Sequence, residues 1–169
     1  TTSIATYFIL FGSLGVAMYA QREIAYVQDD EKKRSKLFWE IFFFRCITMA
    51  ISIIAFYFTY ASHGEYQLYY KILIIQLFAN VLDISWFFQG LEEFKKTVTR
   101  NLLVKILSVI SIFIFVKTQE DLWIYFVIFV LSILLGNISL WVYLPKYIVK
   151  LKGEKLQIFS HLKPTIGLF

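Results

Sequence analysis

The sequence predicts an all-α, polytopic membrane protein. Hydrophobic residues make up 59% of the chain and aromatic residues 20%, whereas only about half of a soluble domain is apolar. The apolar residues are gathered into long runs that are separated by short charged segments. These runs lack the alternation of apolar and polar residues that marks the strands of a membrane barrel, so helices are the expected spanning elements.

Five apolar runs are long enough to be membrane-spanning helices. The hydrocarbon core of a bilayer is roughly 30 Å thick and needs about 20 helical residues. The fourth run is short, and it spans if Lys105 and Lys117 extend toward opposite interfaces. Pro164 suits the first residue of a further helix, because its missing N–H would have no helical partner there. The expected helices cover residues 2–20, 37–60, 70–90, 102–116 and 122–144.

The two ends of the chain suggest that it is part of a longer protein. The sequence starts within an apolar run at Thr1, without a methionine, and stops as another apolar stretch begins. No basic segment with a cleavage site marks the first run as a signal peptide. We therefore expect an interior fragment that forms one partial helical bundle.

Lysine and arginine residues are distributed unevenly among the segments that connect these helices. The segments 21–36, 91–101 and 145–163 are rich in them, and the two segments in between hold few. Because short cytoplasmic loops carry the excess of positive charge, the three rich segments are predicted to be cytoplasmic. In 91–101 the apolar residues share one helical face, which predicts either an amphipathic helix on anionic lipid or a solvated connector.

Two ionisable residues lie inside predicted membrane helices. Arg45 is about 13 Å and Asp83 about 10 Å from the cytoplasmic ends of their helices, at 1.5 Å of rise per residue. Charge at this depth is costly and usually functional, and two opposite charges at similar depth can pair. Polar residues continue each position along one helical face, namely Thr48 and Ser52 after Arg45, and Asn80 before Asp83. These stripes predict a polar layer or cavity, although the pair could instead only hold helices together.

Several other chemistries have no support in the sequence. Cys46 is the only cysteine, so neither an internal disulfide nor a cysteine metal site can form. The sequence has no phosphate-binding glycine loop, zinc motif or serine nucleophile elbow. We expect no enzyme activity and no cofactor other than a coupling H⁺ or Na⁺. The net charge of +5 follows from the basic loops, so nucleic acid is not an expected partner.

Four stretches resemble bacterial polysaccharide flippases of the O-antigen (Wzx-like) type, within the multidrug/oligosaccharidyl-lipid/polysaccharide exporter superfamily. They are residues 21–26 (QREIAY), 83–95 (DISWFFQGLEEFK), 101–105 (NLLVK) and 136–141 (GNISLW). The resemblance implies a full protein with two helical bundles, of which this chain is part of the first. It also implies alternating access at the bacterial inner membrane, moving an undecaprenyl-pyrophosphate-linked oligosaccharide to the outer leaflet. Other polysaccharide-assembly membrane proteins are implied partners.

The resemblance and the buried charges together give a hypothesis for the substrate site. A pyrophosphate needs a cationic partner, and we expect Arg45 to bind it and Arg22 to contact it at the inner end of the first helix. Asp83 would hold Arg45 in the empty state or, alternatively, bind the coupling ion. Asn80 would either line the cavity or pack between helices. Trp86 would either stack on a sugar or anchor its helix near the interface.

Three other functions remain open from the sequence. A drug or cation antiporter of the same superfamily would need a cavity dominated by acidic residues. An integral membrane enzyme of glycan or lipid modification would need a cluster of catalytic His, Asp or Arg side chains near an interface. A purely structural membrane subunit would not require the polar stripes to converge on one cavity.

Overall fold

The computed structural model describes residues 2–13, 15–61, 67–151 and 155–167, and these residues form helices with no strand among them. The α-helices are α1 (Thr2–Ser13), α2 (Val16–Tyr26), α3 (Glu31–Phe56), α4 (Gln67–Val81), α5 (Ser85–Gly90), α6 (Phe94–Phe115), α7 (Leu122–Trp141) and α8 (Leu162–Ile166). Shorter turns of π or 3-10 type are η1 (Tyr57–Ala61), η2 (Gln119–Asp121), η3 (Leu144–Lys146) and η4 (Ile158–His161).

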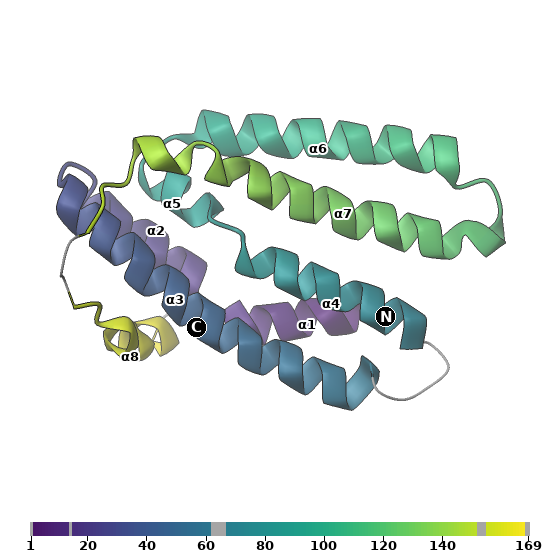
Figure 1. Cartoon of the computed structure of the whole chain (residues 1–169), viewed down its shortest axis with the longest axis horizontal. Helices are drawn as coiled ribbons and strands as arrows, with labels where there is room; N and C mark the ends of the chain where they lie inside the picture. The colour runs from purple at the N-terminus through teal and green to yellow at the C-terminus, as the bar shows by residue number, and fades with distance from the viewer. Residues whose placement is uncertain (1, 14, 62–66, 152–154, 168–169) are drawn as a thin grey trace.

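Long apolar helices dominate the structure. α1 and α2 together form one candidate membrane span that is bent by 41°. In Figure 1, α6 and α7 lie side by side, and α4 lies between α7 and the pair formed by α1 and α3. Each predicted apolar run has a helical counterpart, and the predicted class of an all-α membrane protein is confirmed. The four other candidate spans are Glu31–Tyr60, Gln67–Gly90, Phe94–Phe115 and Gln119–Lys146.

Two helices, α3 and α6, start six or more residues earlier than the sequence predicted. α3 begins at Glu31 instead of residue 37, because the Asp30 carboxylate caps the helix by accepting hydrogen bonds from two main-chain N–H groups, at 3.2 and 3.1 Å. α6 begins at Phe94 instead of residue 102. The predicted segment 91–101 is therefore not a separate surface helix, since residues 94–101 form the first two turns of a candidate span.

Two predicted helices are interrupted. The run 2–20 bends between α1 and α2, where Gly15 has a φ angle of 69°. This left-handed conformation carries little steric cost for glycine, so the chain can change direction there. The run 70–90 is broken at residues 82–84, between α4 and α5. The second break shapes the candidate site.

The three basic segments meet at one end of the bundle, around Tyr147. Arg34 donates hydrogen bonds to the main-chain oxygen of Tyr147 through Nε (3.0 Å) and Nη2 (2.8 Å). The Tyr147 hydroxyl accepts a hydrogen bond from Lys96 (2.6 Å) and donates one to Glu93 (2.7 Å). Hydrogen bonds from Lys96 and from Tyr147 hold the pKa of Glu93 below its ordinary value, so the carboxylate stays charged at neutral pH. The end of α3 and the start of α7 lie at the opposite end (Figure 1).

Aromatic residues fill the core near this basic end. The Phe38 ring lies 5.5 Å from the Trp86 ring and 6.2 Å from the Trp141 ring, measured between centroids. Gly90 allows α5 to lie directly against α2, because a Cβ atom at this position would be 2.7 Å from the main-chain oxygen of Gln21. These contacts hold α2, α3, α5 and α7 in fixed positions around the break in the helix.

His161 attaches the C-terminal segment to α2 and α3. Its Nδ1 lies 2.8 Å from the Tyr19 hydroxyl, and its Nε2 lies 3.1 Å from a carboxylate oxygen of Glu40. All three side chains are buried. The predicted helix start at Pro164 is wrong by two residues, because the chain is already helical in η4 and α8 continues from it at Leu162.

A candidate polar site beside a broken membrane helix

The break between α4 and α5 is centred on Asp83. The Asp83 carboxylate accepts a hydrogen bond from the main-chain N–H of Ser85 (3.0 Å), and the Asp83 N–H donates to Asn80 at 3.3 Å. Aspartate competes in this way with regular helical hydrogen bonding, because its short side chain reaches nearby main-chain groups. The α-helical pattern therefore stops here, and main-chain carbonyls near the break are left without their usual helical partners.

Side chains from neighbouring helices bind three of these carbonyls. Asn137 donates to the Ala79 oxygen (2.6 Å) and Trp141 Nε1 donates to the Leu82 oxygen (2.9 Å), both from α7. Arg45 of α3 donates to the Asp83 oxygen (3.1 Å). A broken helix at membrane depth is tolerated only when its free main-chain groups find such partners. The break is therefore an integral part of the fold.

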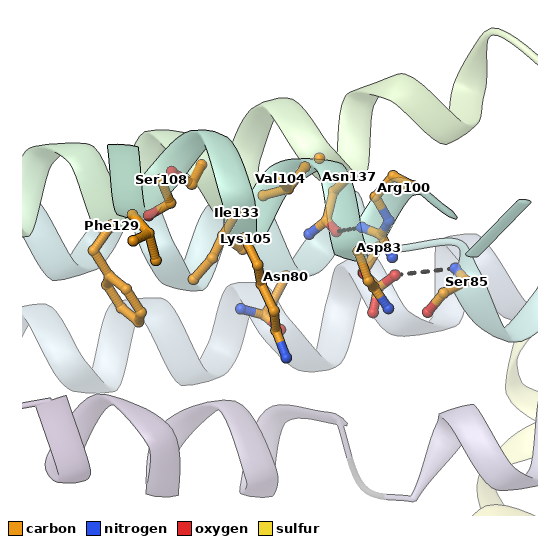
Figure 2. Close-up of a pocket in the computed structure, with 14 residues that line it drawn as sticks. Asn80, Asp83, Ser85, Arg100, Val104, Lys105, Ser108, Phe129, Ile133 and Asn137 are labelled. Carbon is orange, nitrogen blue, oxygen red and sulfur yellow. Dashed lines mark hydrogen bonds between the residues drawn. The ribbon is translucent and has the colours of Figure 1, made fainter. Parts of the chain in front are cut away.

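A pocket of about 540 Å³ opens between the broken helix, α6 and α7 (Figure 2). We call it the α4–α6–α7 pocket. Its lining is rich in amides and hydroxyls that can donate or accept hydrogen bonds. Lys105 extends into it from α6 (Figure 2). The lining residues are Asn80, Asp83, Ser85, Arg100, Asn101, Val104, Lys105, Ser108, Val109, Phe129, Ser132, Ile133, Gly136 and Asn137.

The charged groups that line the pocket are Arg100, Lys105 and Asp83, so cations outnumber carboxylates by two to one. Arg100 donates from Nη1 to Asn137 (2.7 Å), while its buried Nε has no partner among the described residues. Lys105 is exposed and forms no ion pair within the described part of the chain. The pocket therefore offers unused donor capacity and a positive potential, which suits an anionic ligand.

Gly136 allows α6 to approach α7 at the level of these cations. A Cβ atom at Gly136 would lie 3.0 Å from Val104 and 3.5 Å from the Arg100 side chain. A larger residue would require Val104 to move by a few tenths of an ångström or more. Small residues at helix contacts of membrane proteins commonly have this role.

Of the residues predicted for the site, Asp83 and Asn80 line the pocket and Arg45 does not. The Arg45 side chain is only 4% exposed, and its Nη2 lies 4.0 Å from the Asp83 carboxylate. It binds the broken helix from the α3 side, whereas the pocket is bounded by α6 and α7. The Asn80 side-chain NH2 donates to the main-chain oxygen of Gln76 (2.9 Å). The side-chain oxygen of Asn80 is therefore available to the pocket.

Trp86 and Arg22, which were also predicted for the site, lie outside this pocket. Trp86 is fully buried, packs on Phe38 and does not line the pocket. Arg22 is at the surface of α2 and pairs with its neighbour Glu23 at 2.9 Å. Both residues occupy the basic end of the bundle, but neither contacts the cations of the pocket.

Arg100 and Lys105 were not identified as site residues from the sequence. They were assigned to a basic loop and to an interface, respectively, since the fourth helix was expected to start at residue 102. A signal was present in the sequence. Asn101, Lys105 and Ser108 follow i, i+4, i+7 spacing and thus share one helical face. Among the described residues, no cluster of His, Cys, Asp and Glu is arranged to hold a metal ion.

Together, the fold and the site define a helical membrane protein with a discontinuous span next to a polar, net cationic pocket. Secondary transporters commonly place their substrate sites at such discontinuous helices. The chain belongs to the polysaccharide biosynthesis protein family, whose model matches residues 1–169. The resemblance to polysaccharide flippases found in the sequence is thereby confirmed.

Two relatives give a more specific comparison. The chain is 27% identical over 119 residues to a protein of Escherichia coli (strain K12) named "Putative O-antigen transporter", and the match covers 69% of this chain and 29% of that protein. A protein of the same name from Shigella dysenteriae is 40% identical over 60 residues, which is 34% of this chain and 15% of the relative. The chain thus spans less than a third of the relatives' length. No solved structure matches it.

Proposed function

We propose that this chain is part of a flippase that moves an undecaprenyl-pyrophosphate-linked oligosaccharide across the bacterial inner membrane. The family and the names of the relatives support a role in surface-polysaccharide transport. The observation that carries the proposal is the net cationic pocket at membrane depth beside a broken span. A neutral or cationic substrate would not call for two positive charges at this position.

The pocket offers separate groups for the two parts of such a substrate, the diphosphate and the sugars. Arg100 and Lys105 lie about 9 and 17 Å along α6 from its first residue, at 1.5 Å per residue. They can neutralise a diphosphate below the interface, where its charge would otherwise be costly. Asn80, Asn101 and the pocket serines offer hydrogen bonds that suit sugar hydroxyls.

The break at Asp83 gives this proposal a candidate moving part and a candidate ion site. Alternating access requires elements with two arrangements, and residues at a helix break can absorb changes in main-chain angles. Asp83 is the one carboxylate among the residues that line the pocket. We therefore propose Asp83 as the group that binds a coupling H⁺ or Na⁺.

The decisive experiment removes Lys105, the pocket cation that forms no ion pair within the described part of the chain. In the full-length protein, Lys105→Ala should reduce glycan export by about tenfold or more, since a hydrogen bond to a charged group contributes about 1.5–3 kcal/mol. Export is measured in intact cells at matched protein levels in the membrane. Lys117→Ala, just beyond the C-terminal end of α6, is the matched control and should export normally. Wild-type export by Lys105→Ala would remove the basis of the proposal.

The same assay tests the ion site and the antiporter alternative. If Asp83 binds the coupling ion, Asp83→Asn should make the remaining export insensitive to H⁺ and Na⁺ gradients. Unchanged gradient dependence would exclude that role. A drug or cation antiporter would instead move small cations and lose this efflux on Asp83→Asn. The excess of positive charge in the pocket favours the anionic substrate.

A further inference from the structure

A second depression runs along the opposite side of the contact between α6 and α7. It consists of two adjoining parts of about 670 and 230 Å³ that share Val104, Leu107 and Leu135. We call the combined feature the α6–α7 groove. From Lys95 to Ser111 it extends about 24 Å along α6, at 1.5 Å per residue. This length exceeds one hydrocarbon leaflet, which is roughly 15 Å, or half of the bilayer core.

The charged residues of the groove lie toward one end, and the rest of its lining is mainly aliphatic, with serine hydroxyls between the apolar side chains. Lys95 and Lys96 line the end that lies near Tyr147, and there Lys96 pairs with Glu93 at 2.8 Å. Lys95 is exposed and has no partner among the described residues. Leu107 and Leu135 line the apolar part and are 62% and 63% exposed. A surface with a positive head region and a long apolar channel matches a lipid that carries phosphate on a long hydrocarbon chain.

Arg100 connects this groove to the α4–α6–α7 pocket. Its side chain lines both, because it lies at the contact between α6 and α7. It is about 7.5 Å deeper along α6 than Lys95, at 1.5 Å per residue. An anionic group drawn in by Lys95 would therefore meet Arg100 next, and Arg100 already faces the pocket where Lys105 lies.

We infer that the α6–α7 groove is the lateral access site for the polyprenyl diphosphate part of the substrate. The diphosphate lies between Lys95 and Arg100, and the polyprenyl chain lies along Leu107 and Leu135. This inference rests on the proposed function and adds the side from which the lipid reaches the pocket. The shared position of Arg100 favours the transported lipid over a phospholipid, because a phospholipid bound only for structural reasons would not need contact with the pocket.

Photo-crosslinking at three neighbouring positions of α6 tests the inference in the full-length protein. Benzoylphenylalanine is placed in turn at Leu107 in the groove, at Val109 in the pocket and at Ile106, which lines neither. The probe is a radiolabelled polyprenyl diphosphate in nanodiscs. Labelling should be strong at Leu107 and Val109 and weak at Ile106. Lys95→Gln should reduce the labelling at Leu107 roughly fivefold, as expected for one lysine near a membrane surface, whereas Lys146→Gln should not.

The remaining outcomes separate the two proposals. Labelling at Val109 without labelling at Leu107 overturns the access site and leaves the pocket proposal intact. Labelling at Leu107 without Val109 supports the groove and contradicts the pocket as the substrate site. Equal labelling at Ile106, or displacement by excess phosphatidylglycerol as efficient as displacement by unlabelled polyprenyl diphosphate, shows general lipid contact and overturns the inference. Crosslinks from Leu107 to another part of the protein overturn it as well.

Discussion

Arg45 shows that the depth of a charged residue in the membrane does not by itself reveal whether it binds substrate or stabilises the fold. Its depth and its proximity to Asp83 were predicted, and the two side chains lie 4.0 Å apart. The guanidinium nevertheless binds the main-chain oxygen of Asp83 and is almost completely buried. Its contacts in this structure are therefore those of a residue that stabilises the broken helix, and Lys105 is the more accessible cation.

This distinction predicts the phenotype of Arg45→Ala. The substitution leaves the Asp83 oxygen without its donor, which should lower the free energy of unfolding by roughly 2 kcal/mol. Thermal unfolding of the purified full-length protein in detergent measures the effect. Glycan export should fall only as far as the membrane level of the protein falls. Cys46→Ala, at the next position of α3, is the control and should melt close to the wild type. Normal melting of Arg45→Ala combined with loss of export would instead indicate direct contact with the substrate.

At the scale of helices, the break between α4 and α5 depends on hydrogen-bond donors that come from other helices. The main-chain oxygens of Ala79 and Leu82 are bound by side chains of α7, which is distant in sequence. The contact between α4 and α7 is thus made in part by hydrogen bonds to main-chain groups, in addition to apolar packing. Any substitution that removes one of these donors should loosen the break while the helices themselves remain.

Trp141→Phe tests this dependence, because it removes the Nε1 donor to Leu82 and preserves most of the aromatic packing. The expected loss of stability is about 1 kcal/mol, in the range of single hydrogen bonds between membrane helices. Trp123→Phe, an identical change at the exposed start of α7, is the matched control. Thermal unfolding of both variants gives the comparison. Equal stability of Trp141→Phe and Trp123→Phe would show that the Leu82 oxygen does not depend on this donor.

The helices themselves were largely predictable, because long apolar runs directly reflect the thickness of a membrane. Their starts at Glu31 and Phe94 were not, because charged residues at a helix end look like loop residues in a hydropathy pattern. The break at residues 82–84 contains neither glycine nor proline, and only Asp83 signalled it. Asp83 and Asn80, which were predicted to share a polar helical face, both line the pocket. The direction in which Arg45 and Trp86 point depends on the rotation of neighbouring helices, which sequence spacing does not fix.

For the whole molecule, the orientation in the membrane, that is, which end of the bundle is cytoplasmic, determines what the pocket and the groove can bind. Contacts through Tyr147 place the three basic segments at one end of the bundle. The distribution of Lys and Arg predicts that this end is cytoplasmic. A lipid-linked substrate made at the cytoplasmic face would then meet Lys95 and Arg100 before it reaches deeper parts of the pocket. The opposite orientation would place these cations at the exit side of transport.

Cysteine labelling of the full-length protein in intact cells decides between the two orientations. The background is Cys46→Ala, and single cysteines replace three exposed residues, Asp29 and Lys146 at the basic end and Glu120 at the other end. A membrane-impermeant maleimide should label Glu120→Cys in intact cells, and should label Asp29→Cys and Lys146→Cys only after permeabilisation. The reverse pattern would place the basic end outside the cytoplasm, and the proposed direction of lipid access would then be wrong.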